Sequence, residues 1–369
     1  MAVEAADPTD VNRLDHRHAG AMSRIILTLN SGSSSLKFGL HRVDAAGVET
    51  LLSDAVSTVS RREAIQQISA ALVSNSLPTP QAIGHRIVHG GPALRQHCVI
   101  DESVMRQLEA ATPFAPLHTP ASLSLIRGAQ AAWPSLPQVA CLDTTFHLTL
   151  PDVARLLPID RTLQAQGIQR YGFHGLSCES IVHQLGASVP PRLVIAHLGN
   201  GVSVTAVREG RSIDTSMGLT PSGGAMMGSR SGDIDPGVLI YLLRLKQLDV
   251  VGLEYLIDHH SGLLGVSGIG SDMRVLHRAA ELSSDAQLAI AMFCMSVKKQ
   301  IAAMTAVLGG LDLLVFTGGI GEHDALVRAS ICEGMSWLGI AADATAAVRV
   351  LASQEDVQIA RHTALLCQP

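Results

Sequence analysis

One short plan occurs twice in this chain, in segments far apart. An apolar run rich in β-branched residues, 24–30, leads through a Ser/Gly turn into a second apolar run, 36–40. About 170 residues later, residues 192–198 lead through an Asn/Gly turn into residues 202–207. Each copy predicts two antiparallel strands joined by a tight turn. We therefore expect an internal duplication, with a mixed sheet and covering helices in each half. The alternative is chance, because β-hairpins are common.

Further apolar runs alternate with helical patterns along the chain. Strands are expected at residues 84–89, 139–142, 311–317 and 348–352, and helices at residues 284–308 and 355–366. In the longer helix, the spacing predicts one buried stripe: Leu288, Met292, Met295 and Ile301. Strands that alternate with helices predict the α/β class.

Length and composition limit the kind of protein that the chain can form. Its 369 residues favour two domains, and 47% hydrophobic with 16% charged residues argues against disorder. A formal net charge of −5 disfavours nucleic acid as a partner, and the lack of a long uninterrupted apolar run disfavours a membrane span. Residues 1–22 have no signal-peptide core and predict a mobile tail, and the six scattered cysteines fit a reducing, cytoplasmic location.

The expected domains follow from the two copies. We expect a first domain over residues 23–147 and a second over residues 148–354, with the last helix, 355–366, packing back on the first. Three Gly/Ser-rich turns, 30–35, 199–203 and 318–322, follow apolar strands, where backbone N–H groups can approach phosphate oxygens. None has the Walker or dinucleotide-binding pattern, and each alone is more often structural. Together they indicate a nucleotide held between two domains.

Three further segments carry candidate chemistry. On an extended strand, Arg86 and Val88 share a face, which pairs a cation with a small apolar wall, as a short carboxylate requires. A buried structural ion pair would have the same pattern, and His85 and His89 on the other face are interpreted as structural. Asp143 stands at a strand end, which suits either a metal ligand or a helix N-cap. Residues 214–235 form a long Gly/Ser-rich loop around Arg230, and such loops are usually functional.

Together these segments resemble the acetate kinase family, within the superfamily of acetate and sugar kinases, Hsp70 and actin. The resemblance runs from about residue 24 to 366, and its motifs are NSGSSSLKF, GHRIVHGG, APLH, DTTFH, RYGFHG, AHLGNGVSV, DTSMGLTPSGG, GSRSGDIDP, SGIGSDMR, FTGGIGEH and IARHT. It implies two duplicated actin/Hsp70/hexokinase-like domains with the active site in the cleft between them. It also implies a homodimer that uses ATP and acetate and forms acetyl phosphate and ADP.

The resemblance further implies a role for each matching residue. Those next to the reacting groups would be Arg86, Asp143, His174 and Arg230. Those around the acetate methyl would be Val88, Leu117, Phe173 and Pro221. Those on the nucleotide would be Ser33, Ser35, Lys37, His197, Asn200, Gly201, Asp272, Met273, Arg274, Gly319, Ile320, Gly321 and His323. Mg²⁺ or Mn²⁺ would lie near Asn30, positioned by Asp143 and Glu355.

The chain departs from the family pattern at several positions. Leu176–Cys178, His323 and Ser222-Gly223 replace the usual residues, and the connection from Ile340 to Val348 is shortened, which bears on the choice of Glu355. These departures leave two alternatives open: a kinase for propionate or another short-chain acid, and a nucleotide-binding regulator without turnover. A carboxylate needs no strong general base, which argues against a sugar kinase.

Overall fold

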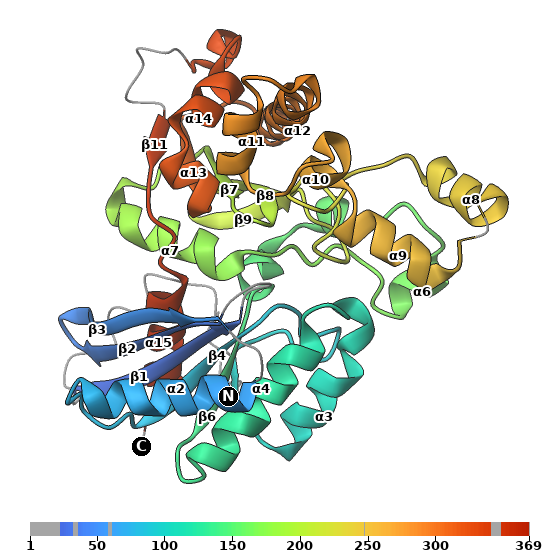
Figure 1. The fold of residues 1–369 in the computed structure, drawn as a ribbon. Coiled ribbons are helices and arrows are strands. Elements are labelled where there is room, and N and C mark those ends of the chain that lie inside the picture. Colours follow the sequence, from blue (N-terminus) through green and yellow to red (C-terminus); the bar gives the residue numbers. More distant parts are fainter. Residues whose placement is uncertain (1–22, 32–35, 58–60, 247, 341–347, 369) are drawn as a thin grey trace, which may run out of the picture. The chain divides into compact units, whose positions relative to one another are not determined.

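The computed structural model describes residues 23–31, 36–57, 61–246, 248–340 and 348–368, so the expected tail, residues 1–22, lies outside them. The described residues form two compact units, both drawn in Figure 1. Unit 1 takes the described parts of Met1–Leu148, Gly175–His183 and Gln354–Pro369, and unit 2 takes Thr149–His174 and Gln184–Ser353. Residues 175–183, which the sequence analysis placed in the second domain, thus pack with the first unit.

Unit 1 is built on a six-stranded mixed sheet in the order β3-β2-β1-β4-β6-β5. Its strands are β1 (Arg24–Ser31), β2 (Leu36–Asp44), β3 (Gly47–Val56), β4 (Ala82–Ile87), β5 (Cys98–Val99) and β6 (Gln138–Leu142). The first three strands are antiparallel neighbours, whereas β4 runs parallel to β1 and β6 runs parallel to β4. The carboxyl ends of β1, β4 and β6 therefore share one edge of the sheet.

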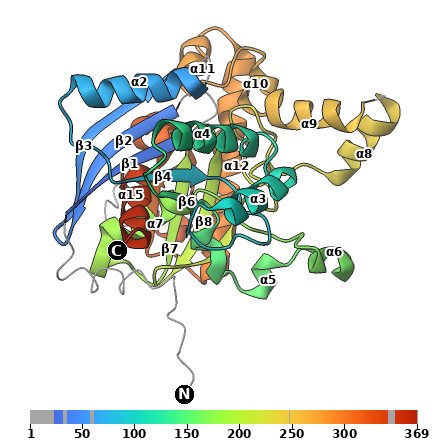
Figure 2. The same ribbon diagram turned by 90° about the horizontal axis from the view of Figure 1, so that it is seen from below.

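Strand alternation gives this sheet two buried faces. Leu27 and Leu29 pack with α2 (Arg61–Ser74) and α4 (Thr119–Ala132), while Ile26 and Ala82 pack with α15 (Glu355–Leu366) on the other face. Figure 2 shows α2 and α15 on opposite sides of β1 and β2. A Cβ at Gly84 would lie 2.5 Å from Cγ2 of Ile359, so this glycine lets α15 approach β4 closely.

Unit 2 repeats the plan of unit 1. Its strands are β7 (Leu193–Leu198), β8 (Val202–Arg208), β9 (Arg211–Thr215), β10 (Leu313–Thr317) and β11 (Val348–Val350), in the order β11-β10-β7-β8-β9. Two antiparallel pairs are followed by two parallel pairs, as in β3-β2-β1-β4-β6, and the register shifts within the outer antiparallel pair of both sheets. This shared topology confirms the duplication expected from the two hairpins.

The remaining helices lie on these sheets or in the connections between their strands. They are α3 (Glu102–Ala110), α5 (Asp152–Arg155), α6 (Arg161–Ala165), α7 (Gly175–Leu185), α8 (Pro236–Leu245), α9 (Val250–His259), α10 (Gly262–Ser267), α11 (Met273–Ala279), α12 (Ser284–Leu308), α13 (Gly318–His323) and α14 (Ala325–Cys332). Short 3₁₀ turns lie at Thr112–Phe114, Thr145–Thr149, Gly186–Ser188 and Ser336–Leu338. The expected turn at 318–322 is therefore wrong, because these residues form α13. The Glu322 carboxylate accepts the N–H of Gly318 at the start of that helix.

Helix α12 has the expected bounds, but its buried face differs from the prediction. Leu288, Met292 and Met295 are 53%, 43% and 49% exposed, and only Ile301 of the predicted stripe is buried. The buried stripe instead holds Ala286, Ala289, Phe293, Cys294, Val297, Ile301, Met304, Thr305 and Leu308. Among the described residues, α12 alone is long and apolar enough to cross a membrane. Its contacts with β7 and β8 are those of a helix that covers a sheet.

Candidate active site

In unit 1, four predicted site residues meet at one edge of the sheet. Asn30 lies near the end of β1, Arg86 near the end of β4, and Asp143 directly after β6. Glu355 is the first residue of α15, the helix that packs under these strands. Because ligands of open α/β sheets bind beyond the carboxyl ends of parallel strands, this edge is where chemistry is expected.

The Arg86 guanidinium is the centre of this cluster. Its Nη2 and Nε donate to Oδ2 of Asp143 at 2.5 and 3.0 Å, and its Nη1 lies 3.4 Å from Oδ1 of Asn30. Glu355 accepts from Nδ2 of Asn30 at 2.9 Å and lies 3.8 Å from Nε of Arg86. The arginine thus contacts two acidic side chains within one hydrogen-bond network. The structure brings together four predicted site residues that come from separate sequence motifs.

Electrostatics in this cluster favour an additional cation. Burial alone would lower the pKa of Arg86, but Asp143 and Glu355 more than offset that effect, so its pKa is raised and it stays charged. Burial raises the pKa of Asp143, with Arg86 opposing that rise and Glu355 adding to it. Burial, and then the charge of Glu355, also raises the pKa of Asp356. Three carboxyl groups therefore surround one guanidinium, and a divalent ion would relieve their mutual repulsion.

Two oxygens in the cluster fit a metal ion. Within the described part of the chain, Oδ1 of Asp143 and Oδ1 of Asp356 are buried without a hydrogen-bond partner. Buried carboxylate oxygens are normally paired or bound to metal, and carboxylates are the ligands that Mg²⁺ prefers. The donor set of Asn30, Asp143, Glu355 and Asp356 therefore suits a hard divalent cation. The sequence alone does not separate Asp356 from Glu355, because neighbouring acids at a helix start cannot be ranked without their contacts.

In unit 2, a second group of predicted residues surrounds the turn between β7 and β8. The rings of His174 and His197 stack with centroids 4.1 Å apart at 17°. A Cβ at Gly201 would lie 3.1 Å from Nε2 of His174 and 3.4 Å from Nη1 of Arg230. The imidazole and the guanidinium thus converge on one point beside a turn that has no side chain of its own at Gly201.

Two contacts hold these groups in place. Arg230 donates from Nη1 to the carbonyl of Pro221 at 3.1 Å, which ties the long loop after β9 to itself. His174 has φ of 56°, which is uncommon for a residue other than glycine, and its Nδ1 lies 2.9 Å from Oγ of Ser203. The sequence motifs give Ser203 no role. The available signal was its place in the strand that directly follows the Gly-Asn-Gly turn.

Most of the expected nucleotide residues of unit 2 lie at the starts of two helices. Asp272 caps α11 by accepting the N–H of Arg274 at 2.8 Å, and the two side chains also form an exposed ion pair. Met273 is buried. Gly319, Ile320, Gly321 and His323 lie in α13, directly after β10, and Asn200 is exposed in the β7–β8 turn. In unit 1, Lys37 is exposed on β2, while Ser33 and Ser35 lie outside the described residues.

The four residues expected around the acetate methyl belong to different units. Val88 is buried just after β4, two residues from Arg86, and Leu117 is 36% exposed in the same unit. Phe173 and Pro221 are buried in unit 2, and the Pro221 carbonyl is bound to Arg230. Each unit thus carries one of the two arginines and two of the four expected pocket residues.

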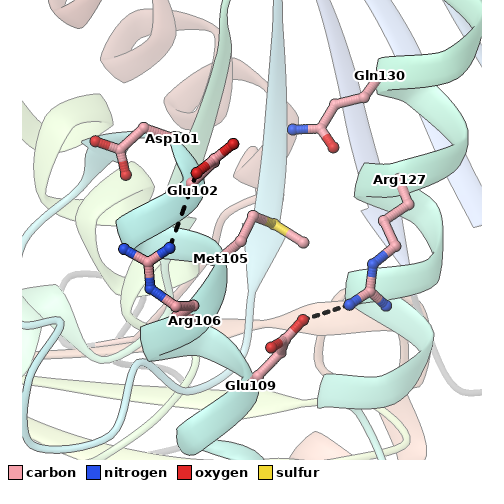
Figure 3. A pocket seen from close by; sticks show the side chains of 7 residues that line it. All are labelled: Asp101, Glu102, Met105, Arg106, Glu109, Arg127 and Gln130. Carbon is pink, nitrogen blue, oxygen red and sulfur yellow. Dashed lines mark hydrogen bonds and ion pairs between the residues drawn. The ribbon is translucent and has the colours of Figure 1, made fainter.

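A surface hollow of unit 1 lies apart from these groups. It is lined by α3 and α4 with about 610 Å³ of space, and Figure 3 shows its side chains. Two ion pairs lie within the hollow, Arg106 with Glu102 and Arg127 with Glu109. None of the predicted site residues lines it.

Comparisons with known proteins show what the chain is similar to. The model of the acetokinase family matches residues 52–366. An acetate kinase of Methylocella silvestris is 37% identical over 94% of this chain and 98% of its own length. A propionate kinase structure from Francisella tularensis is 35% identical with a TM-score of 0.84, covering 93% of this chain and all of its own. An acetate kinase structure from Porphyromonas gingivalis is 31% identical with a TM-score of 0.80, covering 94% of this chain and all of its own.

Proposed function

Because the chain belongs to the acetokinase family, we propose that it transfers the γ-phosphoryl group of ATP to acetate, reversibly, forming acetyl phosphate and ADP. The main support for this proposal is the buried cluster at the strand ends of unit 1. There Arg86 is fixed by Asp143 and Glu355, and two buried carboxylate oxygens lack a partner among the described residues. Such a cluster can bind anions and a divalent cation together.

The side chains supply what direct phosphoryl transfer requires. The transferring group needs positioning and charge neutralisation, and the acetate carboxylate is already a nucleophile, so no general base is needed. Arg86 would bind the carboxylate and the phosphoryl oxygens, with Asp143 holding its planar fork. Arg230 and His174 would add a guanidinium and a hydrogen-bond donor to the equatorial oxygens. His197 would support His174 through the stacked ring.

Mg²⁺ or Mn²⁺ is the cofactor that we propose, held by Asp143 and Glu355 with Asn30 nearby and Asp356 as an additional ligand. When bound, the metal would neutralise phosphate charge and align the β- and γ-phosphates. Asn30 would orient Glu355 through the hydrogen bond already present.

A second candidate substrate is propionate, favoured by the similarity to the propionate kinase structure. Val88 lies two residues from Arg86, so its branched side chain would stand beside the alkyl end of a carboxylate that the arginine binds. One methylene changes binding in such a pocket by about 1–3 kcal/mol, which gives roughly a 10- to 200-fold preference. We expect acetate to be preferred within this range.

The test is hydroxylamine trapping of the acyl phosphate formed from ATP, Mg²⁺ and each of acetate, propionate and butyrate. The proposal predicts acetyl hydroxamate that depends on enzyme, ATP and metal. A nucleotide-binding regulator without turnover would bind ATP and form no hydroxamate with any acid. A higher kcat/KM for propionate would identify the chain as a propionate kinase.

We further propose that the protein is a cytoplasmic homodimer. What supports the dimer is the exposed apolar surface of α8 and α9, two helices that Figure 1 draws as an extension of unit 2. Ile240, Tyr241 and Leu245 of α8 and Val250 and Tyr255 of α9 are each about half exposed or more. Patches of this kind mark protein interfaces. Light scattering should give twice the monomer mass for the wild type and for Val153→Glu, an exposed control on α5, and the monomer mass for Tyr241→Glu.

A further inference from the structure

A buried hydroxyl meets the imidazole that the proposed function places beside the phosphoryl group. Ser203 lies on β8 with no exposed surface, and His174 is 8% exposed. The Ser203 Oγ and the His174 Nδ1 are 2.9 Å apart, the distance of a hydrogen bond.

The direction of this hydrogen bond follows from the requirement that the buried hydroxyl proton has an acceptor. Among the residues that the structure describes, His174 is the one hydrogen-bond partner of Oγ of Ser203. If the hydroxyl accepted from an Nδ1–H group, its own proton would be buried without an acceptor, which is unfavourable. The hydroxyl therefore donates to Nδ1. In the neutral ring, the proton then lies on Nε2.

The Nε2 atom is on the side of the ring that faces the Gly201 turn. It lies 3.1 Å from the point that a Cβ at Gly201 would occupy, and Nη1 of Arg230 lies 3.4 Å from the same point. The His197 ring stacks on His174, which limits rotation of the imidazole. An Nε2–H group held here is aimed at the same small region as the guanidinium.

From these contacts we infer that Ser203 is a positioning residue, which fixes His174 as the Nε2–H tautomer so that it donates to the phosphoryl oxygens. The inference rests on the proposed function, because it assigns His174 to that reaction. The opposite tautomer would present the lone pair of Nε2 to an anionic group and would repel it. Ser203 would thus affect the transition state while touching no substrate.

The test compares Ser203→Ala with Ser203→Thr, which keeps the hydroxyl. Thr205→Val is the matched control, because Thr205 lies two residues along the same strand, is equally buried, and bonds to Thr215 at 2.9 Å. We expect kcat to fall roughly 10- to 100-fold in Ser203→Ala with little change in KM, since loss of a whole oxyanion donor costs about 10²–10³-fold. Ser203→Thr should regain most of this loss, and Thr205→Val should show neither effect.

Two readouts separate positioning from a general effect on folding. In a His174→Ala background, adding Ser203→Ala should change kcat less than 2-fold, because the serine acts through the histidine. Nitrogen NMR of the labelled wild type should show the Nε2–H tautomer at His174, with the Nδ1–H form appearing in Ser203→Ala. An unchanged tautomer, or a full additional loss in the double variant, would overturn the inference. A wild type that forms no hydroxamate would refute the proposed function instead, and the tautomer measurement would still decide the role of Ser203.

Discussion

Gly201→Ala should slow turnover without preventing folding. The added Cβ would lie 3.1 Å from Nε2 and 3.2 Å from Cε1 of His174, and 3.4 Å from Nη1 of Arg230. Ordinary carbon contacts begin at about 3.5 Å, so the imidazole must move by about 0.3–0.5 Å. A displacement of 1 Å in an active site can cost about 100-fold, which gives roughly a 4- to 10-fold loss of kcat here.

The assay is steady-state formation of acetyl hydroxamate, with thermal unfolding measured in parallel. Gly128→Ala is the control for adding a methyl group, because its Cβ would make only an ordinary 3.5 Å contact with Ile65. We expect full activity in this control and a melting temperature of Gly201→Ala close to that of the wild type. If Gly201→Ala had the wild-type kcat, catalysis would not require the close approach of His174 and Arg230 to this turn.

The metal site, the acyl pocket and a buried histidine give three more predictions. Asp143→Ala and Glu355→Ala should both raise the Mg²⁺ concentration needed for half-maximal activity; an unchanged titration for Glu355→Ala would move the metal role to Asp356. Val88→Ala should narrow the preference for acetate over propionate, chiefly by improving propionate, and an unchanged ratio of kcat/KM would remove Val88 from the pocket. Burial lowers the pKa of His85 from 6.5 to about 4, so its contribution to stability is complete above about pH 6.5 and is lost as the pH falls toward 4. Between these pH values the free energy of unfolding should change by about 3 kcal/mol through His85 alone. The free energy of unfolding by urea should therefore depend less on pH in His85→Gln than in the wild type. Equal pH dependence of the two proteins would contradict this role of His85.

The sequence predicts the strands better than it predicts which helix face is buried. Each hairpin was recognisable because an apolar run, a polar turn and a second apolar run form a local pattern, and the shared sheet order then followed. Helix α12 is apolar on more than one side. Periodicity therefore could not choose between the stripe of Leu288, Met292 and Met295 and the stripe of Phe293 and Val297 that packs on the sheet.

Within the candidate site, the residues that depend on strand ends were predictable and those that depend on tertiary contacts were not. Arg86 lies near the end of β4 and Asp143 directly after β6, so their meeting at one sheet edge could be expected from parallel pairing. Asp356 has its role from a buried oxygen beside the cluster, and Ser203 from a bond to a histidine 29 residues earlier in the chain. Contacts of that kind are visible only once the chain is folded.

The proposed reaction assigns charge neutralisation at the phosphoryl group to both Arg86 and Arg230. The most direct measurement is kcat for acetyl hydroxamate formation in wild type, Arg86→Ala, Arg230→Ala and the corresponding Lys variants, with ATP binding measured on each. We expect kcat to fall at least about 100-fold in each Ala variant and to recover partly with Lys, which lacks the planar fork. Near-wild-type kcat in either Ala variant would contradict these roles.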